Sequence, residues 1–242
     1  MSDALRVLVT RPAGQAQALC ELIEASGAHA IPLPAIEILP ASDATAVTAA
    51  ADMLEQYDLA VFISTNAVNT GLAAILEQRS WPAGVALATV GPASQRAVEA
   101  MGLAVDLVPD HNYSSEGLLA LDALQDMRGK RVVIFRGNGG RDTLHDTLRS
   151  RGARVDYVEV YRRACPQGGG QLQSLLQQGG VDVLTATSNE TLQNLFDMAG
   201  PEGQPLLRKT VSYTHLRAHE TERTISYAGF CVTKRGGGGG GG

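Results

Sequence analysis

Short apolar runs alternate along the chain with segments whose apolar residues recur at helical spacing. The run RVLVT at residues 6–10 is typical of a buried strand. The next segment places four apolar residues on one face of a helix: Ala16, Leu19, Cys20 and Ile23. Further strands are predicted, in chain order, at 29–39, 59–64, 86–90, 103–108, 130–135, 154–161 and 181–187. Because helical crossovers join parallel strands, this alternation predicts an α/β fold with parallel sheets covered by helices.

The same pattern occurs twice. Residues 6–28 align with 131–153 without a gap, at an offset of 125, and Arg11 meets Arg136 in this alignment. Residues 58–68 align with 182–192 at an offset of 124. Any two strand–helix units resemble each other to some degree, but two gapless matches at nearly one offset favour two copies of one α/β unit.

The repeat also tests the C-terminal part of the chain. In the first copy, 88–102 reads as a strand, a glycine-containing turn and a helix, whereas its counterpart near 212–226 has none of these signals. We therefore expect the repeat to stop at about Thr210, with C-terminal elements missing. Residues 211–242 begin with VSYTHLRAHET, which resembles a peptide found in conceptual translations of sequencing-library adapters, and end in seven glycines. The alternative is a natural variable tail with a glycine linker. We expect a non-native, disordered tail, an unpaired sheet edge, and a chain that is inactive or nearly so.

Composition excludes several classes of protein. The net charge of the 242 residues is −5, which argues against nucleic acid or an anionic membrane surface as the main partner. No apolar run is long enough to cross a membrane, and no secretory signal opens the chain. Three cysteines without a CxxC pair, Cys20, Cys165 and Cys231, suit a reducing compartment and argue against disulfides or a zinc site. We expect a cytoplasmic monomer.

Motifs for cofactors and metals are weak. The segment RGNGGRD at 136–142 follows a strand and precedes a helix, as a dinucleotide-binding loop does, but Asp142 stands where the third glycine belongs. His29 and His145 are isolated, and the helically spaced pair His215 and His219 lies in the suspect tail. We therefore predict neither a metal nor a cofactor.

Polar turns follow five of the predicted strands. Each stands between an apolar strand and a helix: Thr10-Arg11-Pro12, Ser64-Thr65-Asn66, Gly91-Pro92-Ala93-Ser94, Arg136-Gly137-Asn138-Gly139-Gly140 and Thr187-Ser188-Asn189. The carboxyl ends of parallel strands form the ligand crevice of such sheets, and helix N-termini bind anions through main-chain N–H groups. Any one of these turns is explained as a helix cap. Taken together they favour a site that binds a polyanion.

In order and spacing, these turns resemble the uroporphyrinogen-III synthase family over about residues 5–210. The matching segments are the TRP after the first strand, F-x-S-x-N-A-V at 62–68, V-G-x-x-S at 90–94, R-G-x-x-G-R at 136–141, V-Y at 160–161 and ATSNETLQNL at 186–195. Ala186 departs from the family, in which Phe is more usual at this position. The resemblance implies two similar α/β domains joined by two extended linker strands at 29–40 and 154–165. One domain would then be 41–153, and the other 1–28 plus 166–210, with the substrate in the cleft between them.

The resemblance also implies a reaction without a cofactor. The family closes hydroxymethylbilane into uroporphyrinogen III. The pyrroles expel the terminal hydroxyl, the last ring attacks to give a spiro intermediate, and that ring is inverted when the intermediate recloses. Tyr161 matches the tyrosine of the family's cleft and would assist the departing hydroxyl; the alternative is a tyrosine that only packs beside a linker strand. The implied substrate-binding residues are Thr10, Arg11, Ser64, Asn66, Gly91, Ser94, Gly137, Asn138, Ser188 and Asn189. A small-molecule sensor with the same fold and a nucleotide-dependent oxidoreductase remain as alternatives.

Overall fold

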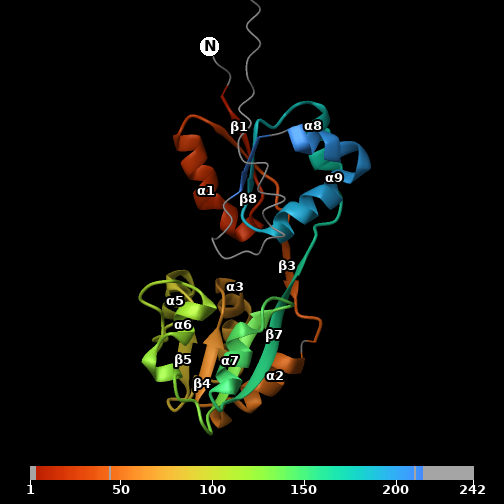
Figure 1. Cartoon of the computed structure of the whole chain (residues 1–242). Coiled ribbons are helices and arrows are strands. Elements are labelled where there is room, and N and C mark those ends of the chain that lie inside the picture. The colour runs from red at the N-terminus through yellow and green to blue at the C-terminus, as the bar shows by residue number, and fades with distance from the viewer. Residues whose placement is uncertain (1–3, 44, 210, 215–242) are drawn as a thin grey trace, which may run out of the picture. The chain divides into compact units, whose positions relative to one another are not determined.

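The computed structural model describes residues 4–43, 45–209 and 211–214. The chain divides into two compact units (Figure 1). The split unit combines Met1–Glu37 with Ala164–Gly242, and the continuous unit is Ile38–Arg163. Each unit contains a sheet of mainly parallel strand pairs with helices packed against it, so the α/β fold predicted from the alternation is confirmed.

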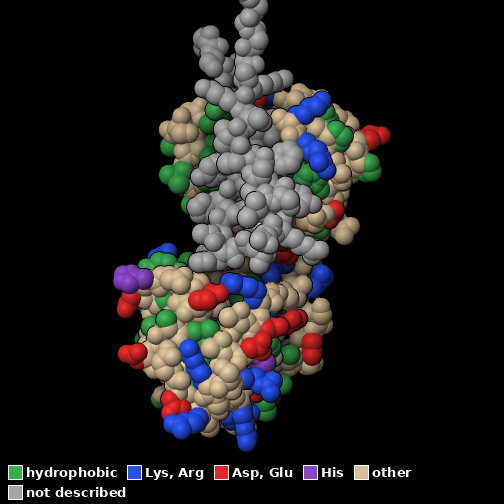
Figure 2. Space-filling model, in the orientation of Figure 1, with side chains coloured by type: hydrophobic (Ala, Val, Ile, Leu, Met, Phe, Trp, Pro, Cys, Tyr) green, Lys and Arg blue, Asp and Glu red, His purple; other side chains and the backbone are tan. Residues whose placement is uncertain are grey.

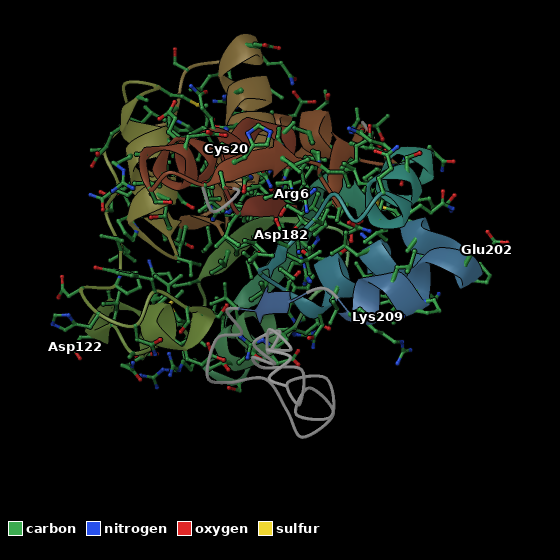
Figure 3. All side chains as sticks on the ribbon, turned by 90° about the horizontal axis from the view of Figure 1, so that it is seen from above. Arg6, Cys20, Asp122, Asp182, Glu202 and Lys209 are labelled. Atoms are coloured by element: carbon green, nitrogen blue, oxygen red, sulfur yellow. The ribbon has the colours of Figure 1, made fainter. Side chains whose placement is uncertain are left out.

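The split unit has a four-stranded sheet in the order β2-β1-β8-β9. Its strands are β1 (Arg6–Val9), β2 (His29–Pro32), β8 (Val183–Ala186) and β9 (Val211–Thr214). Its helices are α1 (Ala13–Ala25), α8 (Gly170–Gln177) and α9 (Asn189–Lys209), and α9 is interrupted by a non-helical residue at Gly200. An ion pair between Arg6 and Asp182, 2.9 Å long, fastens β1 beside β8, and Figure 3 labels both residues.

Both faces of this sheet are covered because its strands are apolar on both sides. Val9 packs with Ala16 of α1 on one face. Leu8 and Leu184 pack on the other face with residues of α8 and α9. Figure 1 shows α1 on one side of β1 and β8, and α8 and α9 on the other side.

The continuous unit has a five-stranded sheet in the order β3-β7-β6-β4-β5. Its strands are β3 (Glu37–Pro40), β4 (Leu59–Phe62), β5 (Ala86–Thr89), β6 (Arg131–Gly137) and β7 (Arg154–Ala164). Its helices are α2 (Thr45–Asp52), α3 (Thr65–Ala67), α4 (Ala73–Gln78), α5 (Pro92–Glu99), α6 (Ser115–Leu119) and α7 (Thr143–Ser150). Shorter turns are η1 (Leu54–Gln56), the π-helical η2 (Val68–Leu72) and η3 (Asp122–Leu124).

Alternation along β4 explains why a run of four apolar residues forms a strand here. Leu59 and Val61 enter the core on one face of the sheet, beside residues of α6 and α7. Phe62 enters the core on the opposite face and stacks on Phe135 of β6, with 4.6 Å between the ring centroids. A strand buried on both faces needs apolar residues at every position, and this leaves the polar residues for the strand ends.

The internal repeat is visible in the strand order. The two sheets run β2-β1-β8-β9 and β7-β6-β4-β5, and strands at equal places begin 124 or 125 residues apart in sequence. The first copy supplies β1, β2, β4 and β5, and the second supplies β6, β7, β8 and β9. Each sheet therefore takes two of these strands from each copy.

Two predicted strands differ in the structure. The segment 29–39 is divided into β2 and β3, which belong to different sheets; Pro32 and Pro34 lack the N–H that a continuous ladder would need. Segment 103–108 contributes only a single bridge, between Leu107 and Ala88. The strand predicted at 154–161 is confirmed as β7, which pairs with β6 from Arg154 to Tyr161.

The prediction that no strand follows Thr210 is wrong. Residues 211–214 form β9, which pairs in parallel with β8, so the expected unpaired edge of β8 is occupied. β9 begins 125 residues after β5, which is the offset of the repeat. Pairing to an existing edge uses backbone groups, which hydropathy does not report. Residues 215–242, which the other predictions about the tail concern, lie outside the described residues.

Candidate functional site

Ser64 follows β4 and begins the next helix. Its extended backbone lets its Oγ accept a hydrogen bond from the Ala67 N–H at 3.1 Å, as a helix cap does. The same Oγ lies 3.2 Å from the hydroxyl oxygen of Tyr161. The cap predicted from sequence is therefore present, and it is joined to the candidate catalytic tyrosine.

Tyr161 lies near the carboxyl end of β7 and is only 4% exposed. Its backbone carbonyl accepts the Asn138 N–H at 3.1 Å. The side-chain oxygen of Asn138 in turn accepts the Arg163 N–H at 2.7 Å. The amide oxygen of Asn138 thus holds β6 and β7 together beyond the end of their ladder.

Gly91 and Ser94 lie at the start of α5. Gly91 stands at the cap position and supplies no side-chain acceptor, and Pro92 is the first helical residue. The N–H groups of the following first turn have no intrahelical partner, which makes this turn suited to an anion. Ser94 is buried. Beneath the turn, the fully buried Thr89 Oγ1 has no hydrogen-bond partner among the described residues.

Arg136 does not face a ligand but fills its own loop. Its side chain is 6% exposed, pairs with Asp142 at 3.0 Å and donates to the carbonyls of Gly137 and Gly139. Its guanidinium lies over the Tyr157 ring, 4.6 Å from the centroid. Asp142 occupies the cap position of α7, so a carboxylate stands where a dinucleotide-binding loop would hold a pyrophosphate.

The split unit contains the remaining candidates. Thr10 is only 1% exposed, and its hydroxyl donates to the Thr185 carbonyl at 2.5 Å, so it joins β1 to β8. Ser188 caps α9 by accepting the Thr191 N–H at 3.1 Å. Arg11 and Asn189 are exposed.

Ser64 and Ser188 are counterparts in the repeat and have the same capping geometry. At Tyr161, 125 residues earlier, the other copy has Ile36. The two units therefore share the cap, and among the residues that the structure describes only the continuous unit adds a phenol to it.

The candidates in the continuous unit lie at one edge of its sheet, because β4, β5, β6 and β7 run in parallel. The structure brings Ser64, Gly137, Asn138 and Tyr161 into one hydrogen-bonded or packed group, next to the Asn66 turn. Sequence reasoning missed Thr89. A hydroxyl near the end of an otherwise apolar run, two residues before the glycine of the turn, was the available signal.

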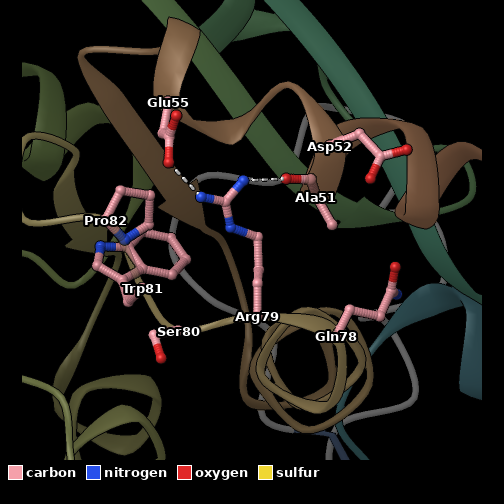
Figure 4. Close-up of a pocket in the computed structure, with 8 residues that line it drawn as sticks. All are labelled: Ala51, Asp52, Glu55, Gln78, Arg79, Ser80, Trp81 and Pro82. Carbon is pink, nitrogen blue, oxygen red and sulfur yellow. Dashed lines mark hydrogen bonds and ion pairs between the residues drawn. The ribbon is translucent and has the colours of Figure 1, made fainter.

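A pocket of about 440 Å³ lies elsewhere in the continuous unit (Figure 4). Its central Arg79 donates to Glu55 and to the Ala51 carbonyl. Trp81 and Pro82 form one wall, before β5 begins, so the pocket is at the opposite end of the strands from the polar turns. None of the candidate site residues lines it.

No group of His, Cys, Asp and Glu side chains in 4–43, 45–209 and 211–214 is arranged to hold a metal ion. Within the same residues, no helix is both long and apolar enough to span a membrane. On the visible face of the continuous unit, basic and acidic side chains are mixed (Figure 2). Many pair with each other, as Lys130 does with Asp58.

The buried Tyr57 and the partly buried Tyr157 determine how the stability of the continuous unit changes at alkaline pH. The pKa of Tyr57 is raised to about 12, mainly by burial and to a smaller extent by a hydrogen bond to Asp156. The pKa of Tyr157 is also raised to about 12, mainly by burial and to a smaller extent by a hydrogen bond to Asp142. A raised pKa stabilises the folded state fully below pH 10 and ceases to do so as the pH rises to 12.

We therefore expect phenolate absorbance to show a late titration step near pH 12, with the free energy of unfolding falling across the same interval. A variant with both Tyr57→Phe and Tyr157→Phe should lose this step and show a shallower fall. An unchanged titration curve in that variant would contradict the assignment.

The chain matches the family model described as uroporphyrinogen-III synthase HemD over residues 17–221. The match continues past Thr210, where the repeat was predicted to end. The chain is 32% identical to the uroporphyrinogen-III synthase of Salmonella typhimurium over 196 residues, which are 80% of each chain. The uroporphyrinogen-III synthase of Escherichia coli K12 matches with the same identity and coverage.

Solved structures agree on the fold. A crystal structure of a mutant uroporphyrinogen III synthase from the extremely thermophilic bacterium Thermus thermophilus matches with a TM-score of 0.61 at 21% identity. The match covers 93% of this chain and 90% of that one. The family model and the curated relatives confirm the resemblance found in the turns after the strands. The chain belongs to the uroporphyrinogen-III synthase family.

Proposed function

We propose that the protein is a uroporphyrinogen-III synthase, which closes hydroxymethylbilane into uroporphyrinogen III with inversion of the last pyrrole ring and loss of water. Family membership and the similarity to the Salmonella and Escherichia coli enzymes support this function. The observation that carries it is the Tyr161 phenol, whose hydroxyl lies beside Ser64 at the carboxyl edge of the sheet.

Tyr161 would act on the hydroxyl that leaves. The pyrroles of the substrate supply the electrons that expel this hydroxyl, so the protein needs a hydrogen-bond donor at the departing oxygen rather than a nucleophile. A phenol is both donor and acceptor, and Ser64 Oγ is the partner that fixes its direction. The surrounding apolar residues of this core exclude water from the ring.

The carboxylate arms of the substrate would bind at the turns. At the start of α5, the first-turn N–H groups follow a glycine cap that supplies no side-chain acceptor, and the helix dipole favours negative charge there. Asn66 and Gly137 belong to neighbouring turns of the same edge. Ser188 and Asn189 offer a capped helix start of the same type, and Arg11 an exposed cation.

Thr10 and Asn138 would act differently. The hydroxyl proton of Thr10 is used by the Thr185 carbonyl, and the amide oxygen of Asn138 is used by Arg163. We therefore propose that these two shape their turns and contribute main-chain groups to the substrate.

Substitutions at Ser188 should separate stability from binding. Ser188→Ala removes a helix cap, which lowers the free energy of unfolding by about 1 kcal/mol, and removes one substrate hydrogen bond, which raises KM about fivefold. Ser188→Asp keeps a cap but sets a negative charge against a carboxylate, so the unfolding free energy should be near wild type while KM rises further.

Denaturant unfolding measures the free energy of unfolding of the two variants, and steady-state kinetics measures their KM. If Ser188→Asp binds substrate as well as Ser188→Ala, then the substrate arms do not lie at this turn.

The test of the function is the isomer formed. Because the sequence led us to expect little or no activity from the 242-residue chain, it is assayed beside a version in which residues 211–242 are replaced by the C-terminus of a family member. Incubated with hydroxymethylbilane, that version should yield uroporphyrinogen III, and it is the protein used for the kinetic measurements below. A sensor with this fold would bind the substrate but would not direct its closure, so the substrate would close without inversion of the last ring. If only the isomer without ring inversion formed at every protein concentration, the proposal would be contradicted.

A further inference from the structure

The β7 strand changes its alternation directly before Tyr161. Arg136 pairs with Glu159 but Gly137 pairs with Tyr161, so Val160 is an extra residue on β7. Such bulges occur beside active sites, where they redirect a side chain.

The bulge changes the face to which Tyr161 belongs. In a regular strand Tyr161 would share a face with Tyr157, because side chains two apart point the same way. Tyr157 packs against the core next to α6 and α7, but Tyr161 joins the opposite core, together with Val160. Gly71 of η2 permits this arrangement: a Cβ there would lie 2.8 Å from Val160 Cγ1.

Gly137 provides the space for the redirected ring. A Cβ on Gly137 would lie 2.5 Å from Tyr161 Cζ and 2.6 Å from Cε2, which is closer than real Cβ contacts. Its backbone is not in the left-handed region, so space rather than conformation requires glycine here. At the other end of the side chain, the Tyr161 hydroxyl is hydrogen-bonded to Ser64 Oγ.

We infer that Gly137 and Ser64 are positioning residues for Tyr161: the glycine seats the ring that the bulge redirects, and the serine holds its hydroxyl. This inference rests on the proposed function for its effect on turnover, but not for its effect on the ring. Neither residue needs to touch the reacting atoms to act in this way.

The first experiment reports on the ring without using activity. The protein is labelled at tyrosine Cζ, and the Tyr161 resonance is assigned by its loss in Tyr161→Phe. Gly137→Ala and Ser64→Ala should each shift this resonance. Ser64→Thr, which keeps a hydroxyl, should leave the resonance near its wild-type position. Gly84→Ala is the matched glycine control, because a Cβ there meets nothing within 4 Å. Ser114→Ala is the matched cap control, because Ser114 caps α6 by the same 3.1 Å bond.

The second experiment is a kinetic cycle. Gly137→Ala should lower kcat by at least about tenfold with a smaller change in KM, and should cause no further loss in the Tyr161→Phe background. Equal losses in both backgrounds, or an unmoved Tyr161 resonance in Gly137→Ala, would overturn the inference. Should Gly137→Ala not fold, the Ser64→Ala and Ser64→Thr pair decides by the same two measurements. If Tyr161→Phe alone has wild-type turnover, the catalytic role of Tyr161 fails, while the resonance shifts still test the positioning.

Discussion

In a version of the protein with an intact family C-terminus, replacing Tyr161 with Phe is expected to lower kcat by roughly 10²–10⁴-fold, the usual contribution of a group that assists proton transfer. The substitution removes one oxygen and leaves the buried ring in place, so the apolar packing is retained. Ser64 keeps its capping bond to Ala67. The free energy of unfolding should therefore change little. Formation of uroporphyrinogen III by the two proteins measures the first effect, and denaturant unfolding measures the second.

Tyr57→Phe is the matched control for this substitution. Tyr57 is also buried, and its hydroxyl also has a side-chain partner, Asp156 at 2.9 Å. It precedes β4 and so lies at the opposite end of the strands from Ser64. Its loss should leave kcat unchanged. Wild-type turnover in Tyr161→Phe would remove Tyr161 from the mechanism.

Replacing Arg136 with Met should give the largest loss of stability among single substitutions near the site, about 2–4 kcal/mol. The methionine fills much of the space but leaves the carbonyls of Gly137 and Gly139 without their donor, and Asp142 without its cation. The contact of the guanidinium with the Tyr157 ring is also lost.

Arg141→Met is the control, since Arg141 pairs with Glu116 at an exposed position and such pairs contribute about 0–1 kcal/mol. Trp81 is the only tryptophan of the chain and packs against the core of the continuous unit, so its fluorescence follows the unfolding of that unit. Equal losses in the two variants would show that burial of Arg136 contributes nothing beyond a surface ion pair.

The architecture was largely predictable because it follows from periodicity. Apolar runs located β1, β4, β6 and β8, and the offset of 125 related the two copies. The same offset places a counterpart of β5 at 211–214, where β9 is found, although the hydropathy of this segment shows no strand. Short edge strands are specified mainly by a partner's free backbone groups, which one sequence segment does not reveal.

The site was predictable only as far as its turns. Caps such as Ser64 and Ser188 have a local signature, and both are present. The inward orientation of Arg136 and the burial of Thr10 depend on neighbouring strands. The bulge at Val160 depends on how β7 meets β6, more than twenty residues earlier in the chain. Contacts of this kind have no periodic signal.

The exchange of strands between the two repeats has a consequence for synthesis of the protein on the ribosome. The continuous unit has all its strands once Ala164 has been made, and it can close while the rest is still being translated. β1 must wait for β8, since Val7 pairs with Val183. Pairing across such a separation is slow. During this interval the nascent N-terminal segment exposes a strand edge and an apolar face, so it is the part of the chain that most needs a chaperone.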